Sequence, residues 1–328
     1  MQEPQTWREL LGQIIEDPQK KQSISEELGV RTITLARWVN HESNPRPQNL
    51  RQLLAALPKY RDILLELISE EFDGFGETIE EDSSKEIPAP FYSRVFEARA
   101  TTSDILRYWS ITNLILQQAL GQLDPGRLGM AIRIVRCMDP DQDHKIHSLR
   151  ESVGLGTNPW EGNLEQSAMF LGAESLAGFV VSSCRSAAIQ NLEEDQSLLP
   201  SQKGKYERSA AIYPIMYAGR IAGCLLVSSA VINYFLAQSR LALIKAYADL
   251  IALAFEPDEF YELEAIELRV MPHHDEQEAY FSNFRKRVAY EMTRASAINQ
   301  PINSIQAEKL VWKQLEQELL NHVLKVGS

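Results

Sequence analysis

Basic side chains are concentrated near the beginning of this 328-residue chain. Residues 18–61 contain eight basic and three acidic residues, a net charge of +5, whereas the whole chain has a formal net charge of −12. Guanidinium and ammonium groups bind phosphate oxygens, and arginine can also donate two parallel hydrogen bonds to guanine. A basic segment within an acidic protein therefore predicts nucleic-acid recognition at one place on the surface.

Three cysteines, Cys137, Cys184 and Cys224, are the residues that could perform redox chemistry. Their odd number and wide separation argue against a disulfide framework and indicate a reducing cytoplasm. Buried thiols of this kind usually pack as small apolar side chains. The alternative is a redox enzyme in which Cys184 acts together with Cys137 or Cys224.

Other chemical motifs are weaker. Histidines gather with carboxylates in residues 139–147 and again in 273–276, but neither group has the thiolates and spacing of a zinc site. Both are interpreted as solvated loops, and no metal ligand is predicted. The chain has no glycine-rich phosphate loop, nucleophile elbow or zincin motif, so no catalytic residue is predicted either.

Composition and hydrophobic periodicity divide the chain into four parts, which together predict an α+β multidomain protein. Residues 1–72 are predicted to form an all-α bundle and 257–328 a helical hairpin. Residues 73–98 are predicted to be an acidic linker, because 70–86 contain eight acidic residues and one lysine. Residues 99–256 alternate helix and strand patterns. The apolar runs are too short to predict a membrane span.

Local patterns specify several elements. Ser103 is a good N-cap for a long helix, and "MAIRIVRCM" and "KIHSLRESVG" read as strands. Two further strands are predicted to be joined at Gly219, and a helix follows them. In the last part, "AYFSNFRKRVAYEMTRA" predicts one helix and Ser304 begins another.

Residues 24–50 contain two short helical patterns around Gly29. A glycine suits a tight turn with positive φ, and Ser25 is a small residue where the helices would cross. The apolar residues at positions that should face inward are Ile24, Leu28, Val30, Leu35 and Trp38. This pattern resembles the phage Cro/repressor type of helix-turn-helix over roughly Trp7 to Leu57, with departures at Ser25 and Arg31.

That resemblance implies binding to double-stranded DNA as a dimer. It places the start of the recognition helix, and thus base contacts, at Arg31, Thr32, Ile33, Thr34 and Arg37. It places phosphate contacts at Lys20, Lys21, Arg46 and Arg51. The alternative is a helical head that binds only another protein, as an adaptor would.

The segments "ESLAGFVVSSCRSAAIQNL", "ERSAAIYPIMYAGRIAGCLLVSS" and "YFLAQSRLALIKAYADLIALAF" resemble a GAF domain over about Thr101 to Phe255. The resemblance implies a central antiparallel sheet flanked by helices, with a small-molecule pocket on one face. It also implies dimerisation through the first and last helices, using the apolar stripes Ile105–Leu120 and Leu241–Phe255. The pocket residues it suggests, each of which could instead be plain core, are Trp160, Phe170, Phe179, Cys184, Tyr213 and Met216.

Together these patterns predict a cytoplasmic, homodimeric, DNA-binding transcription regulator whose DNA binding responds to a small molecule or a redox signal. The sequence identifies no cofactor. It lacks the Asn-Lys-Phe-Asp-Glu signature of cyclic-nucleotide-binding GAF domains, and Cys184 is followed by Arg185 where bilin-binding domains have histidine. The alternatives are a sulfoxide-reductase-like redox enzyme and a protein-binding adaptor.

Overall fold

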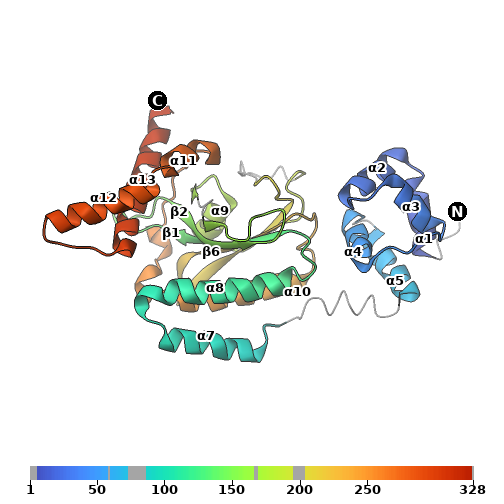
Figure 1. Cartoon of the computed structure of the whole chain (residues 1–328), viewed down its shortest axis with the longest axis horizontal. Coiled ribbons are helices and arrows are strands. Elements are labelled where there is room, and N and C mark those ends of the chain that lie inside the picture. Colours follow the sequence, from blue (N-terminus) through green and yellow to red (C-terminus); the bar gives the residue numbers. More distant parts are fainter. Residues whose placement is uncertain (1–5, 58–59, 73–85, 166–168, 195–203, 327–328) are drawn as a thin grey trace.

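The computed structural model describes residues 6–57, 60–72, 86–165, 169–194 and 204–326. Figure 1 shows a helical bundle at the N-terminal end, a central body of helices around a sheet, and a group of helices at the C-terminal end. The core of the N-terminal bundle shares no described residue with the other apolar clusters. None of the helices in the described ranges is long and apolar enough to cross a membrane.

The described residues of the N-terminal bundle form five α-helices: α1 (Trp7–Ile15), α2 (Pro18–Glu27), α3 (Thr32–Val39), α4 (Pro47–Ala56) and α5 (Arg61–Glu71). Local signals begin the first two. The Thr6 hydroxyl accepts a hydrogen bond from Glu9 N, and the Asp17 carboxylate accepts one from Gln19 N at 2.9 Å. Trp7, Leu35 and other apolar residues from all five helices are buried in a single core.

Arg8 is the polar centre of this bundle and is only 2% exposed. Its Nη2 donates to Glu71 Oε1 at 2.6 Å and its Nε donates to Glu71 Oε2 at 3.2 Å. It also donates to the backbone carbonyl of Trp38 and, at 2.9 Å, to Asn44 Oδ1. One side chain on α1 therefore joins the end of α5, the end of α3 and the loop after α3.

Helix α7 (Ala89–Thr101) occupies residues that were predicted to be linker. The prediction extended the linker to residue 98 on the basis of acidic composition and a Pro-Ala-Pro sequence, but proline is tolerated in the first turn of a helix. Phe91 and Val95, one turn apart, are buried against the central core. The acidic residues 73–85 lie outside the described ranges.

Helix α8 (Asp104–Leu123) follows α7 after a sharp corner. Glu256 holds this corner, because its carboxylate accepts hydrogen bonds from Arg99 of α7 at 2.7 and 2.9 Å and from Arg107 of α8. Four apolar side chains near the corner are more than half exposed, and we call them the α7–α8 patch: Phe96, Ile105, Leu106 and Trp109.

The central sheet has six strands in the order β3-β2-β1-β6-β5-β4, and every neighbouring pair is antiparallel. The strands are β1 (Met130–Cys137), β2 (Leu149–Gly156), β3 (Phe170–Leu171), β4 (Ala187–Ile189), β5 (Ser209–Tyr217) and β6 (Arg220–Ser229). The predicted hairpin is present, with Ala218 and Gly219 between β5 and β6. The expected antiparallel sheet is therefore confirmed.

Helices cover both faces of the sheet. Ile132 and Ile134 of β1 pack with α8 and α10 (Gln238–Ile251) on one face, whereas Val135 packs towards α9 (Leu176–Ser183) on the other. The apolar stripes predicted for dimerisation largely belong to the first of these clusters. Most of each stripe therefore packs against the chain's own sheet, and only the beginning of α8 remains exposed.

Gly223 lies in β6, in the middle of the sheet, with φ +149°. A Cβ atom at this position would lie 2.0 Å from the carbonyl oxygen of Val135 and 2.9 Å from Cα of Arg136. The close approach of β6 to β1 thus requires a residue without a side chain.

The C-terminal part contains α11 (His274–Phe281), α12 (Phe284–Ala297) and α13 (Ser304–Val326). The prediction of a single helix across 279–295 is wrong, because Ser282 and Asn283 lie between the end of α11 and the beginning of α12. Arg287 of α12 pairs with Glu318 of α13 at 2.6 Å. Val311, Leu315 and Leu319 of α13 are buried in a cluster with Met138 and Phe170 of the central domain.

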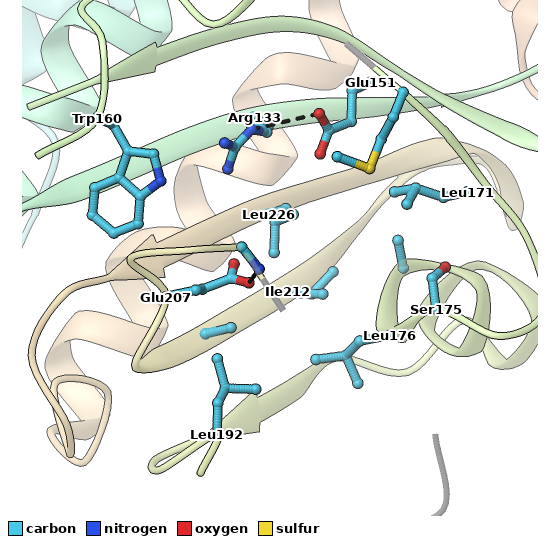
Figure 2. A pocket seen from close by; sticks show the side chains of 14 residues that line it. Arg133, Glu151, Trp160, Leu171, Ser175, Leu176, Leu192, Glu207, Ile212 and Leu226 are labelled. Carbon is cyan, nitrogen blue, oxygen red and sulfur yellow. Dashed lines mark hydrogen bonds and ion pairs between the residues drawn. The ribbon is translucent and has the colours of Figure 1, made fainter. Parts of the chain in front are cut away.

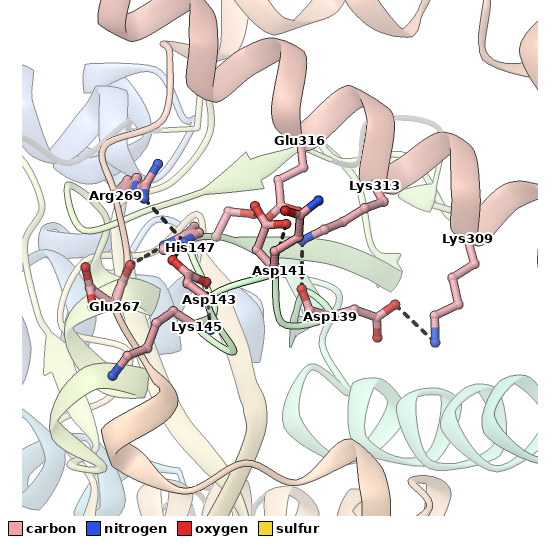
Figure 3. A network of polar contacts seen from close by, with 12 residues as sticks. Asp139, Asp141, Asp143, Lys145, His147, Glu267, Arg269, Lys309, Lys313 and Glu316 are labelled. Carbon is pink, nitrogen blue, oxygen red and sulfur yellow. Dashed lines mark hydrogen bonds and ion pairs between the residues drawn. The ribbon is translucent and has the colours of Figure 1, made fainter.

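A polar network joins α13 to the turn between β1 and β2 (Figure 3). Glu316 is 1% exposed, accepts from Ser148 Oγ at 2.6 Å and pairs with Lys313 at 2.7 Å. His147 in the same turn is also buried. Its Nε2 lies 2.9 Å from Asp143 Oδ2 and its Nδ1 lies 3.0 Å from the carbonyl oxygen of Glu267. The interpretation of this turn as a solvated loop is therefore wrong for His147.

Candidate functional site

The outer surface of α3 presents the residues that were predicted to contact DNA bases. Arg31, Ile33 and Arg37 are exposed, and Thr32 and Thr34 are half-buried. The opposite surface of the helix holds Leu35 and Trp38, which are 0% and 2% exposed. The division follows helical periodicity, because residues three or four positions apart share a face.

The turn before α3 positions this surface. Gly29 has φ +63°, a left-handed conformation in which a Cβ atom would be strained. The buried Ser25 hydroxyl donates to the carbonyl oxygen of Val30 at 2.6 Å. The hydroxyl thereby fastens the end of α2 to the beginning of α3, which gives a physical role to serine at this position.

The predicted phosphate contacts differ in exposure. Lys20 and Arg46 are exposed and Lys21 is half-buried, while the side chain of Arg51 lies outside what the structure describes. Arg37 Nε lies 3.6 Å from Glu42 Oε2, and both side chains are more than half exposed. An exposed pair at this distance contributes little stability, so the arginine can exchange partners readily.

A second candidate site is a cavity of about 90 Å³ on the face of the sheet that α9 covers (Figure 2). Most of its lining is apolar, and β3, α9, β5 and β6 contribute Leu171, Leu176, Ile212 and Leu226 to it. This cavity lies on one face of the sheet, where the resemblance implied a small-molecule pocket. Trp160 lies at one end.

Among the described residues, three charged side chains line this cavity: Arg133, Glu151 and Glu207. Arg133 Nε lies 3.5 Å from Glu151 Oε2, and neither atom has a hydrogen-bond partner among the described residues. Glu207 accepts from Ser228 Oγ and, at 3.2 Å, from Gly204 N. Burial raises the pKa of Glu151 to about 7, a shift that Arg133 reduces and Glu207 increases.

The central domain is expected to lose stability as pH rises through 7, because folded Glu151 holds its proton more tightly than an unfolded glutamate does. This stabilisation is complete below the ordinary pKa of 4.5 and is lost above about 7. The difference in unfolding free energy between pH 5 and pH 8 should be about 2–3 kcal/mol. Urea unfolding of the wild type and Glu151→Gln measures it. Equal pH dependence in both proteins would contradict this assignment.

Of the six residues predicted to line a pocket, only Trp160 does so. Phe170 points to the C-terminal helices, with its ring 5.8 Å from that of Trp312, and Phe179 is 46% exposed. Tyr213 packs on the opposite face of the sheet, and Cys184 and Met216 pack against the apolar cluster under α9. Residue type suggested these positions, but side chains alternate between the faces of a strand, so neighbours such as Leu171 and Ile212 line the cavity instead.

The three cysteines are free and gather in or against that apolar cluster. Cys137 and Cys224 are buried, and Cys184 is half-buried. Burial raises the pKa of all three thiols, that of Cys137 to about 12. Because the thiolate is the reactive form, this environment opposes the redox alternative.

No family model matches the sequence, and no curated protein matches it. Among solved structures, a GAF domain of Acinetobacter phosphoenolpyruvate-protein phosphotransferase aligns with 14% identity and a TM-score of 0.34, over 50% of this chain and 90% of that one. The corresponding Coxiella burnetii domain aligns with 13% identity and a TM-score of 0.34, over 50% and 89%. Thermoplasma acidophilum free methionine-R-sulfoxide reductase aligns with 14% identity and a TM-score of 0.32, over 48% and 99%. Values of this size assign neither a family nor an activity to the chain.

Proposed function

We propose that the chain is a DNA-binding transcription regulator in which the N-terminal bundle reads duplex DNA through α3. The observation that supports this most directly is the exposure of Arg31 and Arg37 on the outer surface of a helix whose inner surface is buried. Arginines at the beginning and in the last turn of an exposed helix are suited to hydrogen bonding with guanine in the major groove. The positive charge of the segment supplies attraction to phosphate.

We further propose that two copies act together, because one module of this size contacts too few base pairs for strong specific binding. The α7–α8 patch is an exposed apolar surface that would join them, since burying it in a dimer would remove four large side chains from water. A dimer with twofold symmetry reads two half-sites of opposite orientation. In this proposal the central domain is GAF-like. Its cavity holds an effector that alters how the two N-terminal bundles of the dimer are placed relative to each other.

Arg37→Ala is expected to weaken specific DNA binding about 5- to 150-fold, the equivalent of about 1–3 kcal/mol for one base contact. Duplexes would first be selected from a random pool by the wild-type chain, and fluorescence anisotropy would then compare the variants. Arg285→Ala, which removes an exposed arginine from α12, is the matched control and should bind as the wild type does. Selected sites should be inverted repeats.

The same titrations over a range of salt concentrations separate this proposal from an adaptor. The logarithm of the association constant should fall linearly with the logarithm of salt concentration, and Arg46→Ala should reduce the slope by about one. Equal binding by Arg37→Ala and Arg285→Ala, or selection that enriches no sequence, would contradict sequence reading by α3.

A further inference from the structure

We propose that the cavity under α9 binds a small organic cation with a short apolar body, such as an alkylammonium or amidinium group. Its volume of about 90 Å³ has room for about three water molecules, or for about four or five non-hydrogen atoms of a ligand. Only the role of this ligand as an effector of DNA binding rests on the proposed function. Binding itself depends on the cavity alone.

The charges that line the cavity select the sign of the ligand. Glu151 and Glu207 are carboxylates, and Arg133 is the one guanidinium among the described lining residues. When all three side chains are ionised, their net charge is therefore −1. A cation entering the cavity neutralises this charge. An anion would meet two carboxylates in a partly enclosed space, where charge repulsion is stronger than in bulk water.

Unmatched hydrogen-bonding groups indicate where the cation would be held. Glu151 is 6% exposed, and its Oε2 accepts no hydrogen bond from any described residue. Arg133 Nε lies 3.5 Å from this oxygen, and it too makes no hydrogen bond to a described residue. A buried acceptor without a donor is unfavourable, and an ammonium or amidinium N–H would supply that donor.

The rest of the lining accounts for the other properties of the ligand. Leu176, Ile212 and Leu226 offer an apolar surface on which an alkyl chain can pack (Figure 2). Trp160 stands at the end of the cavity, with its ring 5.9 Å from that of Tyr206. Aromatic faces attract cations, so this end also favours positive charge. Glu207 is already held by Ser228 and Gly204, and acts as a fixed charge.

Binding of a cation should be coupled to release of a proton. Burial raises the pKa of Glu151 to about 7, and the charged groups that face it are Arg133 on β1 and Glu207 before β5. A bound cation favours the ionised carboxylate and so lowers this pKa. As pH rises toward about 7, the affinity for the cation should therefore increase by up to tenfold per pH unit. Above about pH 7 the affinity should level off.

The test is calorimetric titration of the full chain, without DNA, with butylammonium, butanol and butyrate. Butylammonium is expected to bind at least tenfold more tightly than butanol, and butyrate is expected not to saturate. Glu151→Gln should lose at least tenfold in butylammonium affinity and all of its pH dependence between pH 6 and 8. Glu262→Gln, at an exposed carboxylate outside the cavity, is the matched control.

Equal affinity for butylammonium and butanol, preference for butyrate, or unchanged binding by a folded Glu151→Gln would each overturn the proposal. The comparison of the three ligands on the wild type stands even if the variant does not fold. Because no DNA is present, a negative result leaves DNA reading by α3 intact. Loss of DNA binding in Arg37→Ala likewise has no bearing on the cavity.

Discussion

Replacing Arg8 by methionine is expected to destabilise the N-terminal bundle by about 3 kcal/mol, close to the lower limit for breaking a buried ion pair. Methionine keeps most of the apolar length of the side chain but leaves the Trp38 carbonyl, Asn44 and Glu71 without their shared donor. Three elements would lose their common attachment. Glu71 is about one-third exposed, and this exposure keeps the expected cost near that limit.

Urea unfolding of the full chain, followed by hydrogen exchange of amides in α1, α3 and α5, would measure this loss within the bundle. Arg31→Met is the matched control, because Arg31 is exposed and its side chain does not cap α3. This control should change stability by less than about 0.5 kcal/mol. Similar protection in the two variants would show that the hydrogen bonds of Arg8 do not hold the helices together.

Acid should also weaken this attachment. Burial opposes ionisation of Glu71, but its hydrogen bonds from Arg8 and Trp7 prevail and lower its pKa below the ordinary value. A carboxylate with a lowered pKa contributes stability that is present at neutral pH and is lost as pH falls through the folded pKa. The bundle and the central domain therefore respond to pH in opposite directions, since Glu151 stabilises its domain most at low pH.

Gly223→Ala is expected to cost more than about 4 kcal/mol, because the new methyl group cannot be accommodated without moving a central strand. Its Cβ would lie 2.0 Å from the backbone oxygen of Val135, and backbone cannot swing aside as a flexible side chain does. The positive φ adds strain. Loss of the folded central domain should be visible as early thermal unfolding and poor recovery of soluble protein.

Gly121→Ala is the control with the opposite expected sign. Gly121 lies within α8, is exposed, and a Cβ atom there would meet nothing within 4 Å. Alanine in a helix loses less backbone entropy than glycine, so this variant should be stabilised by about 0.5–1 kcal/mol. If Gly223→Ala melts at the wild-type temperature, the sheet has more freedom at this crossing than the distances indicate.

Periodic patterns in the sequence were sufficient to predict most helices and the main strands. Leu35 and Trp38 face inward on α3, and β5 and β6 are joined where the glycine pattern indicated. Helix α7 was missed because its neighbours are acidic and rich in proline, although Phe91 and Val95 are spaced for a buried helical face. Composition describes a segment on average, whereas burial depends on individual positions.

The charged end of the cavity could not be predicted, because it depends on pairing between strands. β1 and β2 change register between Ile134 and Val135, so that Glu151 lies opposite Val135 and near Arg133. A bulge of this kind has no reliable signature in a single sequence. Arg8 illustrates the same limit, since its partner Glu71 is 63 residues away and was assigned to an acidic run.

The Glu256 carboxylate links the α7–α8 patch to the ionic strength of the solution. Its bonds to Arg99 and Arg107 set the angle at which the two helices present that patch, and all three side chains are partly open to water. Added salt screens such charges over about 10 Å or less, whereas salting-out ions strengthen apolar contacts. Added sulfate would thus strengthen an apolar interface formed by the α7–α8 patch, but it would weaken the ion pairs of Glu256 that hold the two helices. Self-association should therefore be strongest at an intermediate ionic strength.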